Sequence, residues 1–377
     1  MIRASKPISR LIPGQFSAFR QLHSGSRRRR YSKNDNDDDE NDKGTHLYLY
    51  KSKGQHLLTN QRILDTIVRK SAIKPTDTVL EIGPGTGNLT LKLMEAANKV
   101  FAIELDSRMV EILDKRASES GLQDRLTVIR KDALKAEFPL FDLVVANIPY
   151  SISSPLVAKL VFGSIPFRSA TLLLQKEFAR RLLAKPGDSE FNRLAVNVTL
   201  VADVEHVMDV SRREFLPCPK VDSSVVIIRP KAQLPDVNLG EWLAFTRTCF
   251  GKKNKTLGAT FKQKKKVAEL LNFSEMAASN AEYNVSLNNI IKEDDDEESA
   301  DSDGEEECCS CSGSEIGVSP FKEKIMRVLK SGGFDDKRPS KMSNEELLRL
   351  LALFNQAGIY FHGKSNSKCG DNNSEAS

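Results

Sequence analysis

The amino-acid sequence predicts an α/β protein in which a doubly wound parallel sheet is followed by a smaller helical domain. Between residues 76 and 230, short runs rich in β-branched residues alternate with helix-forming stretches. These runs are almost continuously apolar, which is typical of parallel strands covered on both faces. After Pro230 the strand pattern gives way to helical periodicity. With 377 residues, the chain can form one substantial core and a smaller one.

Five runs are the expected parallel strands: 78–82, 100–104, 126–129, 143–146 and 170–174. Helical patterns fill the gaps between them. Two further runs, 204–210 and 221–228, have no convincing helix between them and predict a hairpin that closes one edge of the sheet. The better helical segments after Pro230 are 241–250, 255–271 and 344–357.

The first residues have the composition of an organelle transit peptide. Residues 1–33 contain nine Lys or Arg and no Asp or Glu, and an acidic stretch follows at 35–42. We therefore expect residues 1–46 to be a removable leader and a disordered joint, and the protein to be mitochondrial. The alternative is that the arginines at 27–30 form a nuclear or nucleolar address, or a disordered RNA-binding arm.

The remaining chain is expected to divide at Pro230. Residues 47–230 form the predicted cofactor-binding, catalytic domain, and residues 231–362 form the helical domain. Within the second domain, eleven of the fifteen residues from 293 to 307 are Asp or Glu, which is too much charge to bury, so we expect an excursion or linker there. Residues 363–377 are predicted to be a disordered tail.

Composition argues against a membrane protein and against a metal site. No run approaches the roughly eighteen apolar residues that a spanning helix requires. No histidine lies at ligand spacing from any of the six cysteines, so we expect no structural zinc, no other metal and no disulfide. Cys308, Cys309 and Cys311 could bind a soft metal, but reduced thiols on a solvated segment are the favoured interpretation.

A glycine-rich turn predicts a cofactor site. Gly83-Pro84-Gly85-Thr86-Gly87 follows the first strand and precedes a helix, where glycine lets the backbone approach a ligand closely. Glu104 ends the next strand, twenty-one residues beyond Gly83, and its carboxylate can accept both hydroxyl hydrogens of a ribose. NAD and S-adenosylmethionine both carry that ribose, so a dehydrogenase is one alternative. The Gly-x-Gly-x-Gly spacing favours S-adenosylmethionine, because Thr86 and Asn88 suit a methionine moiety better than a pyrophosphate.

Asp132 follows the third strand and has two interpretations. Its carboxylate is placed to accept a hydrogen bond from the adenine amine of the cofactor. An Asp at the start of a turn is equally often a cap for backbone N–H groups.

Asn147-Ile148-Pro149-Tyr150 follows the fourth strand, at the edge where open α/β sheets bind ligands. The Asn147 side-chain oxygen and the carbonyl of Ile148 or Pro149 can accept both hydrogens of an exocyclic amine, which prepares its lone pair to attack a methyl group. Pro149 stiffens the loop, and Tyr150 can stack on a flipped base. The alternative is an Asx-turn with a packed tyrosine.

Several segments in order resemble the ribosomal RNA adenine dimethyltransferases, over roughly residues 47–361. They are Gly54-Gln55-His56-Leu57-Leu58, residues 81–90, Asn147-Ile148-Pro149-Tyr150, Gln175-Lys176-Glu177 and residues 215–225. The last segment, which reads Phe-Leu-Pro-Cys-Pro-Lys-Val-Asp-Ser-Ser-Val, is far more specific than a glycine turn. Within the family the chain resembles the eukaryotic nucleolar branch, through Lys253-Asn254-Lys255-Thr256-Leu257 and residues 354–361. The leader therefore indicates a nucleolar-type enzyme retargeted to an organelle.

The resemblance implies a class I methyltransferase with a Rossmann-like fold and S-adenosyl-L-methionine as cofactor. It also implies a substrate, two adjacent adenosines in the loop of the last small-subunit rRNA hairpin, each converted to N6,N6-dimethyladenosine. Phe215 would sandwich the target adenine opposite Tyr150. The cofactor contacts that the family implies fall on His56, Leu58, Gly83, Glu104, Asp132 and Asn147, and we add Gly85 from the glycine turn.

A basic segment predicts the RNA surface. Residues 247–266 hold eight Lys or Arg and no acids, and Arg247, Lys252, Lys253 and Lys255 are the expected RNA contacts. The alternative is a solvated helix face. Because A-form RNA is recognised largely by shape, we expect the substrate to be small-subunit rRNA within a ribosomal particle, and the protein to be a monomer. A non-catalytic ribosome assembly or mitochondrial transcription factor on the same fold is the competing function.

Overall fold

The computed structural model describes residues 55–252, 254–278 and 315–361. Four predicted features lie outside the described residues: the leader and joint at 1–46, the acidic insertion at 293–307, the tail at 363–377, and Lys253. The same holds for four of the cysteines: Cys308, Cys309, Cys311 and Cys369. Predictions about these parts therefore rest on the sequence alone.

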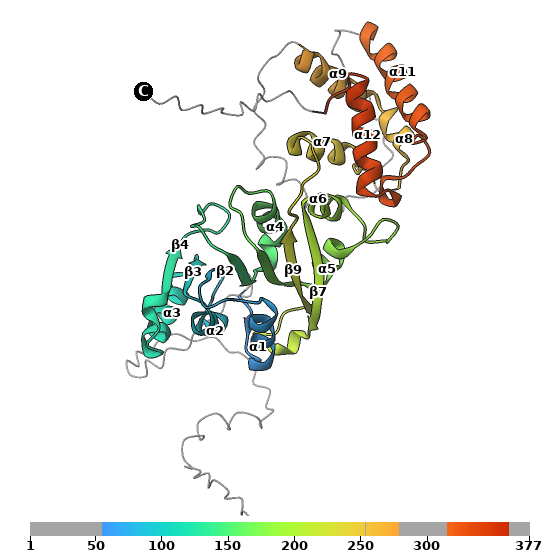
Figure 1. Cartoon of the computed structure of the whole chain (residues 1–377). Helices are drawn as coiled ribbons and strands as arrows, with labels where there is room; N and C mark the ends of the chain where they lie inside the picture. Colours follow the sequence, from blue (N-terminus) through green and yellow to red (C-terminus); the bar gives the residue numbers. More distant parts are fainter. Residues whose placement is uncertain (1–54, 253, 279–314, 362–377) are drawn as a thin grey trace, which may run out of the picture. The chain divides into compact units, whose positions relative to one another are not determined.

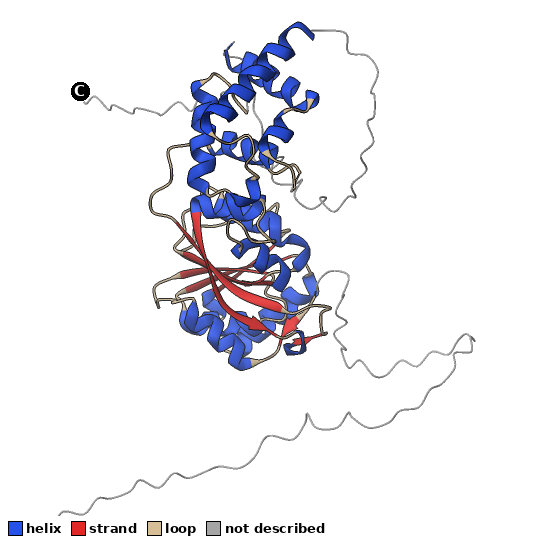
Figure 2. Ribbon diagram, turned by 90° about the vertical axis from the view of Figure 1, so that its right-hand side faces the viewer, coloured by secondary structure: helices blue, strands red, loops and turns tan. Residues whose placement is uncertain are grey.

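Seven strands of the described chain form one twisted sheet with the order β4-β3-β2-β5-β6-β9-β7 (Figure 2). Strands β2 to β6 run parallel, whereas β9 is antiparallel to both β6 and β7. The predicted doubly wound sheet and its closing antiparallel pair are thus confirmed. The strands are β2 (Thr78–Ile82), β3 (Lys99–Glu104), β4 (Leu126–Arg130), β5 (Leu143–Asn147), β6 (Ser169–Gln175), β7 (Ala202–Val210) and β9 (Ser223–Pro230).

The strand order places a switch point at β2. The chain runs from β2 to β3 and β4 on one side, and then returns to β5 on the other side. Connections on opposite sides of β2 leave a crevice at the carboxyl ends of β2 and β5, where open α/β sheets bind ligands. The glycine turn follows β2, and Asn147 ends β5.

Helices cover both faces of this sheet (Figure 1). Leu80 and Ile82 of β2 pack with α4 and α5 in one core, while the alternating Val79 packs with α1 and α2 in another. A strand that is apolar on both sides supplies both cores, as the sequence predicted. The helices of this part are α1 (Gln61–Lys70), α2 (Asn88–Ala96), α3 (Ser107–Glu119), α4 (Ser153–Val161), α5 (Lys176–Leu183) and α6 (Arg193–Val201). Single 3-10 turns are η2 (Gln123–Arg125), η3 (Tyr150–Ile152), η4 (Arg212–Glu214) and η5 (Pro339–Lys341).

A second, two-residue pairing was not predicted. Strand β1 (Leu57–Leu58) pairs antiparallel with β8 (Phe215–Leu216), which joins the start of the described chain to the loop between β7 and β9. Two residues are too few to show any periodicity, so this pairing depends on tertiary contact alone.

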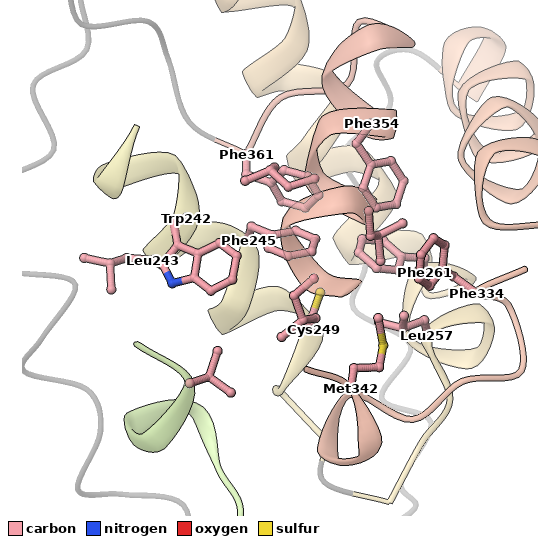
Figure 3. Close-up of a cluster of buried hydrophobic side chains, with 14 of the residues drawn as sticks. Trp242, Leu243, Phe245, Cys249, Leu257, Phe261, Phe334, Met342, Phe354 and Phe361 are labelled. Atoms are coloured by element: carbon pink, nitrogen blue, oxygen red, sulfur yellow. The ribbon is translucent and has the colours of Figure 1, made fainter. Parts of the chain in front are cut away.

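The C-terminal helices share an aromatic core. Trp242, Phe245, Phe261, Phe354 and Phe361 are all at most 2% exposed, and the rings of Phe245 and Phe361 meet edge-on with centroids 5.0 Å apart (Figure 3). Residues of α6 belong to the same core. The helices are α7 (Leu239–Cys249), α8 (Leu257–Phe261), α9 (Lys264–Ala278), α11 (Glu315–Gly332) and α12 (Asn344–Gln356).

Two helical predictions need correction. The single helix expected at 255–271 is two, because α8 ends at Phe261 before α9 begins at Lys264. The amide nitrogens of Leu257 and Gly258 donate to the carbonyls of Lys337 and Asp335, each at 2.9 Å, so a distant loop fixes where α8 starts. Helix α11 was not predicted; it contains Pro320, a residue that usually interrupts a helix.

Candidate functional site

A cavity of about 560 Å³ lies at the switch point, a volume in the range of small-molecule sites. Residues that the sequence analysis selected from six separate segments line it together. They are His56, Gly83, Gly85, Glu104, Asp132, Asn147, Pro149, Tyr150 and Phe215. Leu58 is not among the lining residues; its side chain is 4% exposed and packs in the core, so its assignment to a cofactor stays a prediction.

Two features of the glycine turn favour glycine: its backbone has positive φ angles, and neighbouring side chains lie close to it. Gly83 and Gly85 have φ of +70° and +55°, in the left-handed region that favours glycine. A Cβ at Gly85 would lie 2.7 Å from Leu57 Cδ2, and a Cβ at Gly83 would lie 3.3 Å from Pro149 Cδ. A side chain at Gly85 would have to move the end of the Leu57 side chain, and one at Gly83 would crowd the Pro149 ring; the positive φ would strain both substitutions.

Glu104 ties this turn to the end of β3. One carboxylate oxygen accepts the backbone N–H of Gly85 at 3.2 Å, and the other accepts those of Leu105 and Asp106 at 2.8 and 2.9 Å. Three backbone donors hold the carboxylate in one orientation at the cavity wall. A carboxylate has about four lone-pair sites, so these three donors leave Oε2 with capacity to accept a hydroxyl hydrogen from a ligand.

Both interpretations of Asp132 have support in the geometry. Its Oδ1 accepts the N–H of Leu134 at 2.9 Å, and its carbonyl accepts the N–H groups of Lys135 and Ala136 at 3.0 and 2.8 Å. Asp132 thus caps a local turn, as the structural alternative expected. It also lines the cavity, so capping does not remove it from a ligand's reach.

The Asn147 side chain is fixed from across the cavity. Its Nδ2 donates to the His56 carbonyl at 3.1 Å, which leaves Oδ1 as the atom able to accept hydrogens from a ligand. An Asx-turn would need an N–H two residues along the chain, but that residue is Pro149, which has none. The amide therefore serves a tertiary contact rather than its own turn.

Tyr150 and Phe215 approach the cavity differently. The Tyr150 hydroxyl bonds to Ser223 Oγ at 2.7 Å, and its ring stacks on His56 with centroids 6.1 Å apart and planes 27° apart. Burial raises the pKa of Tyr150 above its ordinary value, so the phenol keeps its proton. Phe215 is only 4% exposed and packs beside Leu58, its partner in the β1–β8 pairing. It lines the cavity, and its predicted stacking on adenine remains a prediction.

The segment before β1 closes over the site through contacts that sequence reasoning missed. Gln55 Nε2 donates to Asp106 Oδ2 at 2.8 Å, and the His56 ring nitrogen Nδ1 donates to the Pro217 carbonyl at 2.7 Å. Hydrogen bonds from Arg108 first, and from Gln55, hold the pKa of Asp106 well below its ordinary value.

Leu105 also lines the cavity, and 66% of its surface is exposed, so it offers an apolar group suited to contact with an aromatic ring. Its only signal in the sequence was its place directly after Glu104.

A basic cleft of about 410 Å³ lies on α5 and on the loop that leads into β9; it is lined by Lys176, Glu177, Arg180, Arg212, Lys220, Val221 and Asp222. The Lys176 amide donates to the Asp222 carbonyl at 3.0 Å, directly before Ser223, which bonds to Tyr150. The cleft is thus adjacent to the wall of the cavity. Arg180 and Arg212 were missed from sequence, because their segments are thirty-two residues apart and meet only in the fold.

The predicted RNA contacts of the helical region are exposed wherever they are described. Arg247 lies in the last turn of α7, and Lys252 and Lys255 lie in the loop before α8. Exposure fits both the RNA surface and the solvated face, so their role stays a prediction.

Within the described ranges, no group of three or more His, Cys, Asp or Glu is arranged to hold a metal ion. Of the cysteines described, Cys218 is exposed and Cys249 buried, and both are free. The described helices also include none that is long and apolar enough to cross a membrane.

Comparison with known proteins gives a consistent result. Residues 48–293 match the family described as ribosomal RNA adenine dimethylase. The chain is 65% identical over 316 residues to the mitochondrial ribosomal RNA small subunit methyltransferase of Arabidopsis thaliana, which covers 84% of this chain and 81% of that protein. A second Arabidopsis thaliana ribosomal RNA small subunit methyltransferase is 50% identical, covering 83% of this chain and 92% of that protein.

Among solved structures, a dimethyladenosine transferase from Plasmodium falciparum superposes with a TM-score of 0.67 at 39% identity. The match covers 81% of this chain and 99% of that chain, and so extends beyond the sheet into the helical region.

Proposed function

Because this chain belongs to the ribosomal RNA adenine dimethylase family, and is therefore an rRNA methyltransferase, we propose that it dimethylates adenine N6 of two adjacent adenosines in the 3′-terminal hairpin loop of small-subunit rRNA. The observation that carries this proposal is the Asn147 amide, fixed by the His56 carbonyl with its oxygen available in a cavity that also holds the glycine turn. That arrangement supplies a cofactor site and an amine acceptor within one enclosure.

The proposed cofactor is S-adenosyl-L-methionine, which supplies an electrophilic methyl group when bound. The residues present suit it: the Glu104 carboxylate for the ribose hydroxyls, Asp132 for the adenine amine, and Leu105 for the apolar face of the adenine ring. Gly83 and Gly85 let the backbone approach the methionine part. His56 and the backbone at Leu58 complete the contacts that the family suggests.

The target amine must have its lone pair turned out of the purine ring before it can attack. Asn147 Oδ1 accepts one N6 hydrogen, and a backbone carbonyl accepts the other. The Pro149 carbonyl already accepts the N–H of Ile152 at 3.1 Å and the hydroxyl of Ser153 at 3.4 Å. The Ile148 carbonyl is therefore the better second acceptor. Methyl transfer leaves an acidic ammonium that loses its proton readily, so no strong base is required.

Stacking and phosphate contacts hold the substrate. Tyr150 and Phe215 offer rings for the flipped adenine, and stacking of this kind contributes about 1 to 3 kcal/mol per base. We place the RNA backbone along the basic cleft, because its cations adjoin the Tyr150 wall, and along Arg247, Lys252, Lys253 and Lys255. Selectivity for a ribosomal particle follows from recognition by shape.

We further propose a mitochondrial location, with nucleus or nucleolus as the alternative. The acid-free basic leader supports it, as does the word mitochondrial in the name of the Arabidopsis thaliana relative. A non-catalytic assembly or transcription factor is the less supported function, since Asn147, Tyr150 and Phe215 all remain around the cavity.

Methyl transfer to unmethylated small ribosomal subunits tests the proposal. With tritiated S-adenosylmethionine and nuclease digestion, the unaltered protein should yield N6,N6-dimethyladenosine. Asn147→Ala should lose nearly all transfer and still bind the particle, because binding comes from distributed phosphate contacts. Tyr150→Phe should retain much of the activity, since the ring does the stacking. Transfer by Asn147→Ala at the normal rate would favour the non-catalytic function.

A further inference from the structure

Lys159 holds the turn that forms one wall of the cavity, although its own side chain does not line the cavity. Lys159 lies in α4, and its Nζ donates to three backbone carbonyls of the turn after β4: Ala133 at 2.9 Å, Leu134 at 3.0 Å and Ala136 at 2.5 Å. The same nitrogen lies 4.1 Å from the centroid of the Phe138 ring. Lys159 itself is not among the cavity-lining residues.

This arrangement uses the full capacity of the ammonium. A charged lysine has three N–H donors, and here three carbonyls converge on it. These carbonyls belong to a turn, where no neighbouring strand pairs with them, and buried backbone carbonyls need partners. The contacts with charge are the stronger kind of hydrogen bond. Burial lowers the pKa of Lys159, and the nearby charge of Asp132 opposes that shift.

The braced turn carries the proposed adenine site. Asp132, Ala133 and Leu134 line the cavity, and Asp132 Oδ1 accepts the N–H of Leu134 at 2.9 Å. Leu134 is thus held by Asp132 through its N–H and by Lys159 through its carbonyl. The Asp132 carboxylate is therefore bonded to a turn whose carbonyl groups are held by the Lys159 ammonium.

We infer that Lys159 is a positioning residue for cofactor selection, which holds the Asp132 carboxylate toward the adenine amine. The inference rests on the proposed cofactor. Helix α4 begins at Ser153, directly after the Asn147–Tyr150 loop, so Lys159 also fastens the helix that follows the target-base motif to the cofactor wall. The ammonium is engaged in these contacts and does not serve the RNA.

A neighbouring lysine provides a matched control. Lys135 belongs to the same turn, is exposed, and has no side-chain bond to any residue of the described ranges. If Lys159 acted only through its positive charge, removing either lysine would have the same effect on cofactor binding. Comparing the two substitutions therefore distinguishes the effect of the lost hydrogen bonds from the effect of the lost charge.

Calorimetry with S-adenosylhomocysteine and with S-inosylhomocysteine, in which oxygen replaces the adenine amine, tests the inference on the full-length protein. Lys159→Met should weaken S-adenosylhomocysteine binding about tenfold, the value of one well-placed charge-assisted hydrogen bond. It should bind the inosine analogue almost as the unaltered protein does, so the preference for adenine shrinks. Lys135→Met should change neither affinity.

Lys159→Arg keeps the positive charge but presents a planar fork that cannot meet three converging carbonyls. Lys159→Arg should fold and should lose less of the preference for S-adenosylhomocysteine over the inosine analogue. This variant therefore tests the inference even if Lys159→Met does not fold. A lower melting temperature with an unchanged adenine preference in both variants would overturn the inference and leave Lys159 a structural residue. Failure of the unaltered protein to bind S-adenosylhomocysteine would instead contradict the proposed cofactor.

Discussion

At the scale of single residues, the groups that could be predicted are those whose position follows from the ends of strands. Glu104 and Asn147 end strands, and the glycine turn follows one, so a parallel sheet brings them to one edge. Gln55, Arg212 and Lys159 could not be found in this way. Their partners, Asp106, Lys220 and the Ala133 turn, are reached only through tertiary packing.

Glu81 is another residue whose importance the sequence hid. It precedes the glycine turn, is 1% exposed, and its Oε2 has no hydrogen-bond partner among the described residues. Burial raises the pKa of Glu81 to about 8; the charge of Glu104 adds to the shift and the Thr90 hydroxyl opposes it. The carboxyl is therefore neutral in the folded protein at pH 7, whereas it is charged in the unfolded chain.

This pKa predicts how stability depends on pH. Because the pKa is higher in the folded state, the stabilising contribution of Glu81 is complete below about pH 4.5 and is lost as the pH rises toward 8. In Glu81→Gln the side chain is neutral in both the folded and the unfolded state, so this loss of stability does not occur. The free energy of unfolding of the variant should therefore exceed that of the unaltered protein by an amount that grows to on the order of a few kcal/mol as the pH rises from 5 to 8. Denaturant unfolding at several pH values measures the difference.

Glu137→Gln, an exposed substitution, is the control and should follow the unaltered protein at every pH. A stability difference between Glu81→Gln and the unaltered protein that does not vary with pH would contradict the buried neutral carboxyl.

At the scale of elements, periodicity identified the strands well and the ends of helices poorly. The five parallel strands appear within a residue or two of their predicted bounds, because a continuous apolar run marks a doubly covered strand. The start of α8 depends instead on bonds to residues 335–337, and β1 and β8 exist only because they meet. Local sequence carries no signal for either.

The two basic surfaces allow a prediction about RNA binding. Arg180→Gln with Lys220→Gln removes two cations from the basic cleft, and Lys252→Gln with Lys255→Gln removes two from the helical region. Each lost phosphate contact should reduce the slope of log affinity against log salt by about 0.7 to 0.9. Cofactor affinity should not change, since none of these four side chains lines the cavity.

Filter binding of small-subunit particles across a salt series provides the slopes. Lys115→Gln on the exposed face of α3, where Lys115 contacts Glu119 at 3.9 Å, is the control and should leave the slope unaltered. An unchanged slope in either double variant means that the surface concerned is only solvated.

At the scale of the whole molecule, fold class and family were predictable because their motifs lie at the switch point of the sheet. The division into two domains at residue 230 stays a prediction, and α6, from the first, packs in the aromatic core of the C-terminal helices. Sequence patterns describe elements one at a time and cannot show which core an amphipathic helix joins. The compartment, by contrast, stays a proposal that is based on the basic leader and on the name of a relative.

The central claim, that this protein dimethylates adenosines of small-subunit rRNA in mitochondria, is tested most directly in cells that lack it. Mass spectrometry of rRNA from separated mitochondria and cytosol should show N6,N6-dimethyladenosine lost from the mitochondrial small subunit only. The unaltered protein should restore the modification, and Asn147→Ala, imported to the same level, should not. Unchanged dimethyladenosine in both compartments, or full restoration by Asn147→Ala, would contradict the account.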